Sequence, residues 1–135
     1  IEGLLDGTID IIATDHAPHS KVDKMCTMDE AAFGISVLET ALPSLISLTE
    51  TSAVSLPLLI EKLTVEPANF LNLDTGSIEV GKIADLTIFS ATEEWKVEPN
   101  NFLSKGKNTP LEGDILKGKI KATIKKGVTI YDKDK

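Results

Sequence analysis

A short apolar run that ends in a polar cluster constrains the fold of this chain more than any other feature. Residues 8–14 read Thr-Ile-Asp-Ile-Ile-Ala-Thr and are largely apolar on both faces, although Asp10 interrupts them. Such a run is typical of a β-strand buried on two sides, as in a parallel sheet. The cluster Asp15-His16-Ala17-Pro18-His19 follows directly, and its proline should end the strand. This order predicts an α/β fold with polar groups at the carboxyl end of a strand, where (β/α)₈ barrels carry their catalytic residues.

Residues 20–73 predict a polar loop followed by helices. The loop is expected over residues 20–30, which are mostly polar. Apolar side chains then recur at helix spacing, which predicts a first helix that Pro43 should kink or divide. The side chains that carry this spacing are Leu38, Leu42, Leu45 and Ile46.

Two further helices are expected before residue 73. One should begin at Ser55, with Pro57 in its first turn, and the other at Thr64, with Pro67 in its first turn. We expect the third helix to pack residues 70–71, Phe-Leu, inward.

The remaining residues predict a small β region. Residues 86–89 form a short apolar run, and residues 120–124 alternate between apolar and polar side chains, as a half-exposed strand does. Lys126 and Gly127 predict a turn into a strand over residues 128–131, so that the pair forms a hairpin. We therefore place a boundary near residues 72–77, between a helical region of residues 1–73 and a β region of residues 74–135.

Composition excludes several classes of partner. The formal net charge is −7, and phosphate binding needs clustered Lys and Arg, so we expect no nucleic-acid partner. No apolar run reaches the roughly 18 residues of a membrane span, so we expect no membrane partner. Cys26 is the only cysteine and cannot form an internal disulfide, which favours a cytoplasmic location.

The length indicates a part of a larger fold. A whole barrel needs about 250 residues, so a chain of 135 residues would supply only its last strand and helices. The chain also opens with Ile1-Glu2-Gly3 and no initiator Met. We expect it to be a piece of a longer protein.

Asp15 and the two histidines beside it are the residues best suited to chemistry. An Asp directly after a buried strand can be a metal ligand, a general base, or only a cap of a turn or helix. His16 and His19 are the only histidines, and a histidine can donate, accept or bind a metal near neutral pH. A zinc site needs three or four ligands, so this chain alone does not assemble a complete one.

Several segments resemble class I bacterial dihydroorotases, of the amidohydrolase superfamily. Residues 12–19, IATDHAPH, resemble the last barrel strand and loop of that family, and residues 32–35 and 38–43, AFGI and LETALP, resemble its next segment. Residues 102–110, FLSKGKNTP, also resemble dihydroorotases, whereas LTVEPA and GKIADL are shared more widely by amidohydrolases. The resemblance implies that residues 1–73 form the last strand and C-terminal helices of a TIM barrel. It implies that residues 74–135 form the C-terminal part of a small β-sandwich.

The resemblance also implies an activity and a site. The family catalyses the reversible, zinc-dependent cyclisation of N-carbamoyl-L-aspartate to L-dihydroorotate in pyrimidine biosynthesis. Asp15 matches the family's metal-binding aspartate, which acts as general base and then general acid. His19 matches the residue that binds the substrate carboxylate, and Phe33 and Gly34 match positions whose backbone contacts the substrate ring. One or two zinc ions are implied, with the remaining ligands upstream of this chain. For His16 we expect structural hydrogen bonding only.

The partners and alternatives follow from the same resemblance. Expected partners are the small-molecule substrate, the missing N-terminal part of the same enzyme and further copies in a homo-oligomer; aspartate carbamoyltransferase is a candidate. The chain alone should be inactive. One alternative is another cyclic amidohydrolase, such as a hydantoinase or allantoinase. Another is an inactive dihydroorotase-like scaffold of aspartate carbamoyltransferase, against which the presence of Asp15 and His19 argues.

Overall fold

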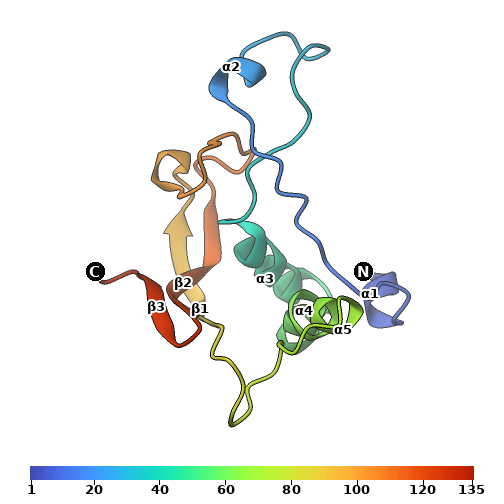
Figure 1. Cartoon of the computed structure of the whole chain (residues 1–135). Coiled ribbons are helices and arrows are strands. Elements are labelled where there is room, and N and C mark those ends of the chain that lie inside the picture. Colours follow the sequence, from blue (N-terminus) through green and yellow to red (C-terminus); the bar gives the residue numbers. More distant parts are fainter.

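A computed structural model describes residues 1–135 and combines short helices with one antiparallel sheet (Figure 1). Residues 6–40 contain little regular structure apart from one helical turn, and the main helices precede the sheet in the chain. No helix is both long and apolar enough to span a bilayer. The elements are α1 Glu2–Leu5, α2 Lys21–Lys24, α3 Ala41–Thr51, α4 Leu56–Leu63, α5 Val65–Phe70, β1 Leu86–Lys96, the 3₁₀ turn η1 Pro99–Asn101, β2 Ile115–Lys125 and β3 Val128–Asp132.

Helices α4 and α5 begin where the local sequence predicts, whereas α3 begins later than predicted. The Ser55 side chain accepts a hydrogen bond from the Leu58 amide and caps α4, as predicted. Helix α5 follows Thr64, also as predicted. Helix α3 begins only at Ala41, so Pro43 lies in its first turn, where its missing N–H costs no helical hydrogen bond. The predicted kink at this proline was therefore wrong.

Two further predictions in the helical region were wrong. Phe70 and Leu71 do not pack inward: they are 75% and 59% exposed, because α5 ends there and nothing in this chain covers that end. The polar stretch 20–30 is not only a loop, since Ser20 and Asp23 form a capping box that starts the single turn of α2.

The sheet has the strand order β1-β2-β3, and both pairs are antiparallel. The strand predicted at residues 86–89 is confirmed and extends to Lys96. The predicted hairpin is also confirmed: Lys126 and Gly127 have φ values of 50° and 77° between β2 and β3. Two consecutive positive φ values give the turn whose twist matches that of the flanking strands.

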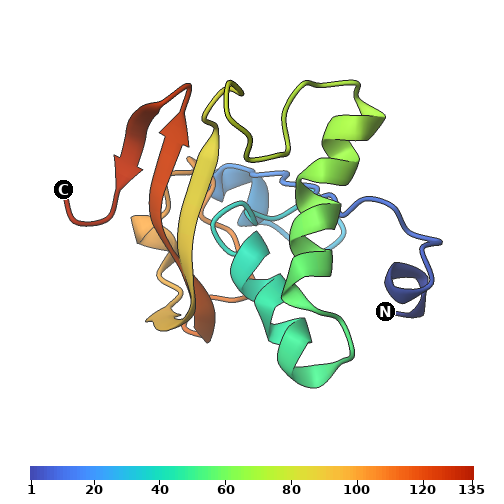
Figure 2. The ribbon, with the colours of Figure 1, turned by 90° about the horizontal axis from the view of Figure 1, so that it is seen from below.

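The core lies where α3 packs on β2, with α4 on the far side of α3 (Figure 2). Gly118 in β2 permits the close approach, because a Cβ there would lie 2.5 Å from Ile46 Cδ1 and 3.3 Å from the Pro43 Cα. The core is small, with 13 of 135 residues buried. Because α3 packs on β2, the helices and the sheet share one core. The predicted domain boundary between residues 73 and 74 stays a prediction. The buried apolar side chains include Ile46, Val54, Leu59, Ala68, Val97 and Phe102.

The predicted buried strand at residues 8–14 is not formed in this chain. The segment is irregular and partly exposed, and Ile12 is joined to the helices by a hydrogen bond from its amide to the Lys62 carbonyl, 3.1 Å. A strand of a parallel sheet is held by neighbouring strands, and the only sheet here is the antiparallel one at the other end of the molecule. The apolar sequence alone therefore does not produce a strand.

Candidate active site

Asp15 lies within the irregular segment that leads from α1 to α2. Its φ is 47°, in the left-handed region, which Asp and Asn tolerate better than most residues. The residue is exposed, and its carboxylate has no hydrogen-bond or ion-pair partner within the chain. A carboxylate held in this way is free to act as a ligand or a base.

His19 is joined to the second predicted segment. Its Nε2 lies 2.6 Å from the Phe33 carbonyl oxygen, so Nε2 carries the proton and donates it. The Phe33 side chain is 91% exposed, so its backbone, rather than its ring, is what this contact fixes. Ser20 follows His19 and caps α2, and its hydrogen bonds lower the pKa of Asp23 below the usual value.

Gly34 fits closely against the loop that carries Asp15. Its φ is 123°, and a Cβ there would lie 2.6 Å from both the Cβ and the carbonyl oxygen of Ala17. The Ala17 amide donates to the Ile35 carbonyl at 3.1 Å, which holds the two segments together. The Gly34 carbonyl accepts from Lys24 Nζ at 3.0 Å. His19, Phe33 and Gly34 thus meet in space, whereas Asp15 adjoins them only through the chain.

A third segment, residues 104–108, lies against these two (Figure 1). The buried Ser36 hydroxyl donates to the Gly106 carbonyl at 2.7 Å, and the Ser36 amide donates to the Asn108 carbonyl at 2.7 Å. The Asn108 side chain lies 3.5 Å from the Gly34 carbonyl. Ser36, Ser104 and Lys24 were not among the predicted site residues. The resemblance of residues 102–110 to one family was the signal that pointed to this segment.

His16 connects all three segments. Its Nδ1 lies 3.0 Å from the Val37 amide and 3.2 Å from the Leu38 amide, and its Nε2 lies 3.3 Å from Ser104 Oγ. The predicted role in structural hydrogen bonding is therefore confirmed. Beside it, the Ser104 amide donates to Glu39 Oε1 at 2.8 Å.

The residues present do not by themselves fit a metal ion. No group of three or more His, Cys, Asp or Glu side chains is arranged to hold one. Both nitrogens of His16 and the Nε2 of His19 are already engaged within the chain. This leaves the Asp15 carboxylate as the one group in the cluster suited to ligation, and a single carboxylate is not a site.

The sequence matches known proteins over nearly its whole length. Residues 1–130 match the amidohydrolase family. The dihydroorotase of Thermoanaerobacter sp. is 48% identical over 136 residues, an alignment that covers 100% of this chain and 31% of that protein. The dihydroorotase of Syntrophus aciditrophicus is 44% identical over 133 residues, covering 98% of this chain and 31% of that protein. The chain thus spans about a third of the length of these relatives.

Solved structures give the same fold. The L-hydantoinase (dihydropyrimidinase) of Arthrobacter aurescens matches with a TM-score of 0.87 and 30% identity, over 98% of this chain and 31% of that one. The D-hydantoinase of Thermus sp. matches with a TM-score of 0.86 over 99% of this chain and 31% of that one; its 18% identity shows the fold alone. The predicted fold class, the C-terminal part of an α/β amidohydrolase, is confirmed. Since the family match covers residues 1–130 of 135, this chain belongs to the amidohydrolase family.

Proposed function

We propose that this chain forms the C-terminal part of a cytoplasmic dihydroorotase of pyrimidine biosynthesis, which interconverts N-carbamoyl-L-aspartate and L-dihydroorotate. The identity of 44–48% to dihydroorotases supports the substrate class. The single observation that carries the proposal is the contact of His19 with the Phe33 carbonyl at 2.6 Å, beside an unpartnered Asp15. The contact joins two residues, His19 and Phe33, that the resemblance assigned to the substrate site, although they lie 14 positions apart.

Asp15 is the proton carrier in this proposal. In the hydrolytic direction, a water oxygen bonds to the ring carbonyl carbon while the Asp15 carboxylate takes a proton from that water. The C–N bond then breaks, and Asp15 returns the proton to the departing ring nitrogen. One carboxylate can do both steps, because taking the proton leaves it as a general acid and returning the proton leaves it as a general base. Its exposure and its lack of an internal partner suit this role.

His19 and the Gly34 backbone bind the substrate in this proposal. While Nε2–H of His19 stays on the Phe33 carbonyl, Nδ1 is the ring nitrogen that is free to meet a ligand. Donation from Nδ1 as well requires the cationic ring, which attracts an anionic substrate. The glycine lets the Ala17 turn pack directly against residue 34, which keeps the backbone at residues 33 and 34 beside His19.

Zinc is part of the proposal, with Asp15 as one ligand and the other ligands outside this chain. When bound, one or two zinc ions would supply an acidified water and polarise the carbonyl. Further copies of the protein and aspartate carbamoyltransferase are the other partners in this proposal.

A hydantoinase-type amidohydrolase is the second candidate. The 30% identity and TM-score of 0.87 to the L-hydantoinase of Arthrobacter aurescens favour it. Both candidates open a cyclic amide, so they differ in substrate rather than in the step assigned to Asp15.

A chimera tests both candidates. This chain replaces the matching 31% of the Thermoanaerobacter dihydroorotase, and the product is assayed with zinc on dihydroorotate, hydantoin and allantoin. We expect turnover of dihydroorotate. Preference for hydantoin would favour the second candidate, and no turnover of any substrate by a folded chimera would refute both.

The variant Asp15→Asn then tests the assigned base. Asn keeps the size of Asp and tolerates the left-handed backbone, so the change replaces the carboxylate by a neutral amide of the same shape. We expect kcat to fall about 1,000-fold with an unchanged melting temperature. The matched variant His19→Ala should instead raise KM. Near-normal kcat in the first variant would show that Asp15 is not the base.

A further inference from the structure

The imidazole of His16 is held at both nitrogens by groups from two distant segments. Nδ1 faces the Val37 and Leu38 amides at 3.0 and 3.2 Å, and Nε2 faces Ser104 Oγ at 3.3 Å. A backbone N–H only donates, so Nδ1 must be the unprotonated acceptor. The neutral ring then carries its proton on Nε2 and donates it to Ser104. One tautomer therefore satisfies all three contacts.

The two segments that His16 joins are also tied to each other. The Ser104 amide donates to Glu39 Oε1, and the Ser36 hydroxyl donates to the Gly106 carbonyl. Residues 36–39 and 104–106 thus form one support, which we call the His16 clamp. The histidine sits at its centre, 21 positions from Val37 and 88 from Ser104.

The His16 clamp affects Asp15 because the two residues are adjacent in the chain. Asp15 precedes it directly and has a φ of 47°, a conformation that a loop does not hold without support from its surroundings. The Asp15 side chain has no internal contact that fixes it. The bonds of the next residue therefore hold the backbone from which the Asp15 carboxylate projects.

We propose that His16 is a positioning residue, which holds the Asp15 carboxylate in place through the His16 clamp in its Nε2-protonated form. This inference rests on the proposed function, because it concerns the residue that carries the proton there. It differs from the role of His19, whose Nε2 contacts the Phe33 carbonyl and whose other nitrogen is assigned to the substrate.

Three substitutions in the active chimera test the inference. In His16→Asn, the amide oxygen stands where Nδ1 accepted, so the Val37 and Leu38 bonds survive. In His16→Gln, the amide reaches the place of Nε2 but leaves the two backbone donors unpaired. His16→Ala removes both.

We expect His16→Ala and His16→Gln to lower kcat about 100-fold, as a misplaced catalytic group does, with KM changed less than about threefold. His16→Asn should keep kcat within about fivefold of the parent, because the acceptor remains. Equal losses in all three variants, or losses confined to KM, would overturn the inference while leaving the proposed function intact. An inactive parent chimera would instead refute the proposed function.

Nitrogen NMR of the 135-residue chain tests the tautomer without any activity. The chain has two histidines, so the signals that vanish in His16→Asn belong to His16. We expect a pyridine-like shift for its Nδ1 and a pyrrole-like shift for its Nε2. The reverse assignment would refute the clamp.

Discussion

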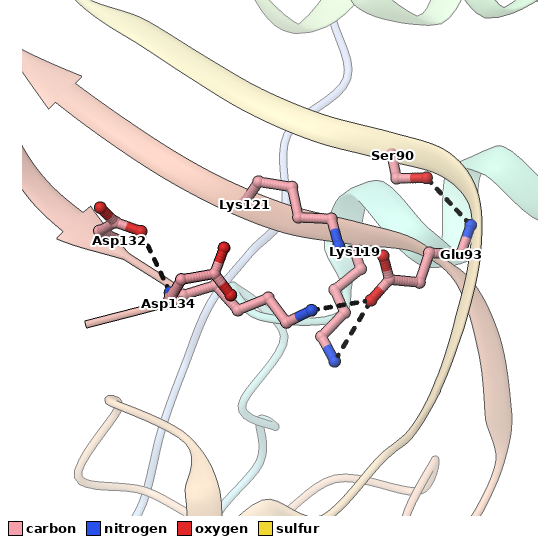
Figure 3. Close-up of polar contacts among 7 residues, drawn as sticks. Ser90, Glu93, Lys119, Lys121, Asp132 and Asp134 are labelled. Carbon is pink, nitrogen blue, oxygen red and sulfur yellow. Dashed lines mark hydrogen bonds and ion pairs between the residues drawn. The ribbon is translucent and has the colours of Figure 1, made fainter.

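At the scale of single residues, Glu93 forms ion pairs with three lysines on or beside the sheet. Its carboxylate meets Lys119 at 3.6 Å, Lys133 at 3.1 Å and Lys121 at closer range (Figure 3). The register of β1 against β2 is irregular between Ser90 and Glu94, and a bulge of this kind redirects a side chain. Hydrogen bonds from Lys121 and Lys133 lower the pKa of Glu93 from 4.5 to about 2.

This shift predicts a pH-dependent contribution to stability. Because the folded-state pKa of Glu93 is lowered, its contribution should be complete above about pH 4.5 and lost as the pH falls towards 2. Melting temperatures of the parent and Glu93→Gln chains check it: the parent should melt higher at pH 7, and the gap should close near pH 2. Glu112→Gln is the control, since Glu112 is exposed and has no ion pair. A gap that persists unchanged at low pH would contradict the prediction.

At the scale of elements, the contact of α3 with β2 holds the helices to the sheet. The approach depends on Gly118, which has a φ of 100° and lies against Pro43 and Ile46. The first turn of α3 is thereby fixed on the strand. Since residues 36–39 lead directly into this helix, the same contact also supports the His16 clamp.

The variant Gly118→Ala should destabilise the chain by about 1–3 kcal/mol, because its Cβ would lie 2.5 Å from Ile46 Cδ1. Urea unfolding measures the change. Gly113→Ala is the matched control: its φ is 88°, but a Cβ there meets nothing within 4 Å, so it carries the backbone strain alone. Adding Ile46→Val removes Cδ1 and should restore part of the loss. Equal costs at the two glycines would show that the helix contact is not limiting.

At the scale of the whole molecule, the chain leaves much apolar surface uncovered. Only 13 of 135 residues are buried, whereas Ile78, Val80 and Ile83 are 61–107% exposed. The strands β1 and β3 are both edges of the sheet, and open edges pair readily with other chains. These edges and this apolar surface are therefore open to pairing with further polypeptide.

The isolated chain should therefore be inactive. Without a complete set of metal ligands of its own, we expect it to hydrolyse no dihydroorotate with added zinc, under conditions in which the chimera turns over. The fall in absorbance of dihydroorotate measures the reaction. Turnover by the isolated chain above the protein-free rate would contradict this prediction.

The sequence by itself determined the features that depend on neighbours along the chain. Ser55 and Pro57 start α4, and Lys126 with Gly127 turns the hairpin, because a cap or a turn is decided by a few consecutive residues. The Asp15 cluster was likewise visible as a motif, and its resemblance to one family indicated the kind of chemistry.

The tertiary structure alone decided what depends on residues far apart. Residues 8–14 have the composition of a buried strand but no strand to pair with, and Phe70 is exposed because no partner covers it. The meeting of His16 with Ser104 spans 88 positions. Composition and spacing describe what a segment can do, whereas pairing, burial and the support of Asp15 depend on which other segments reach it in space.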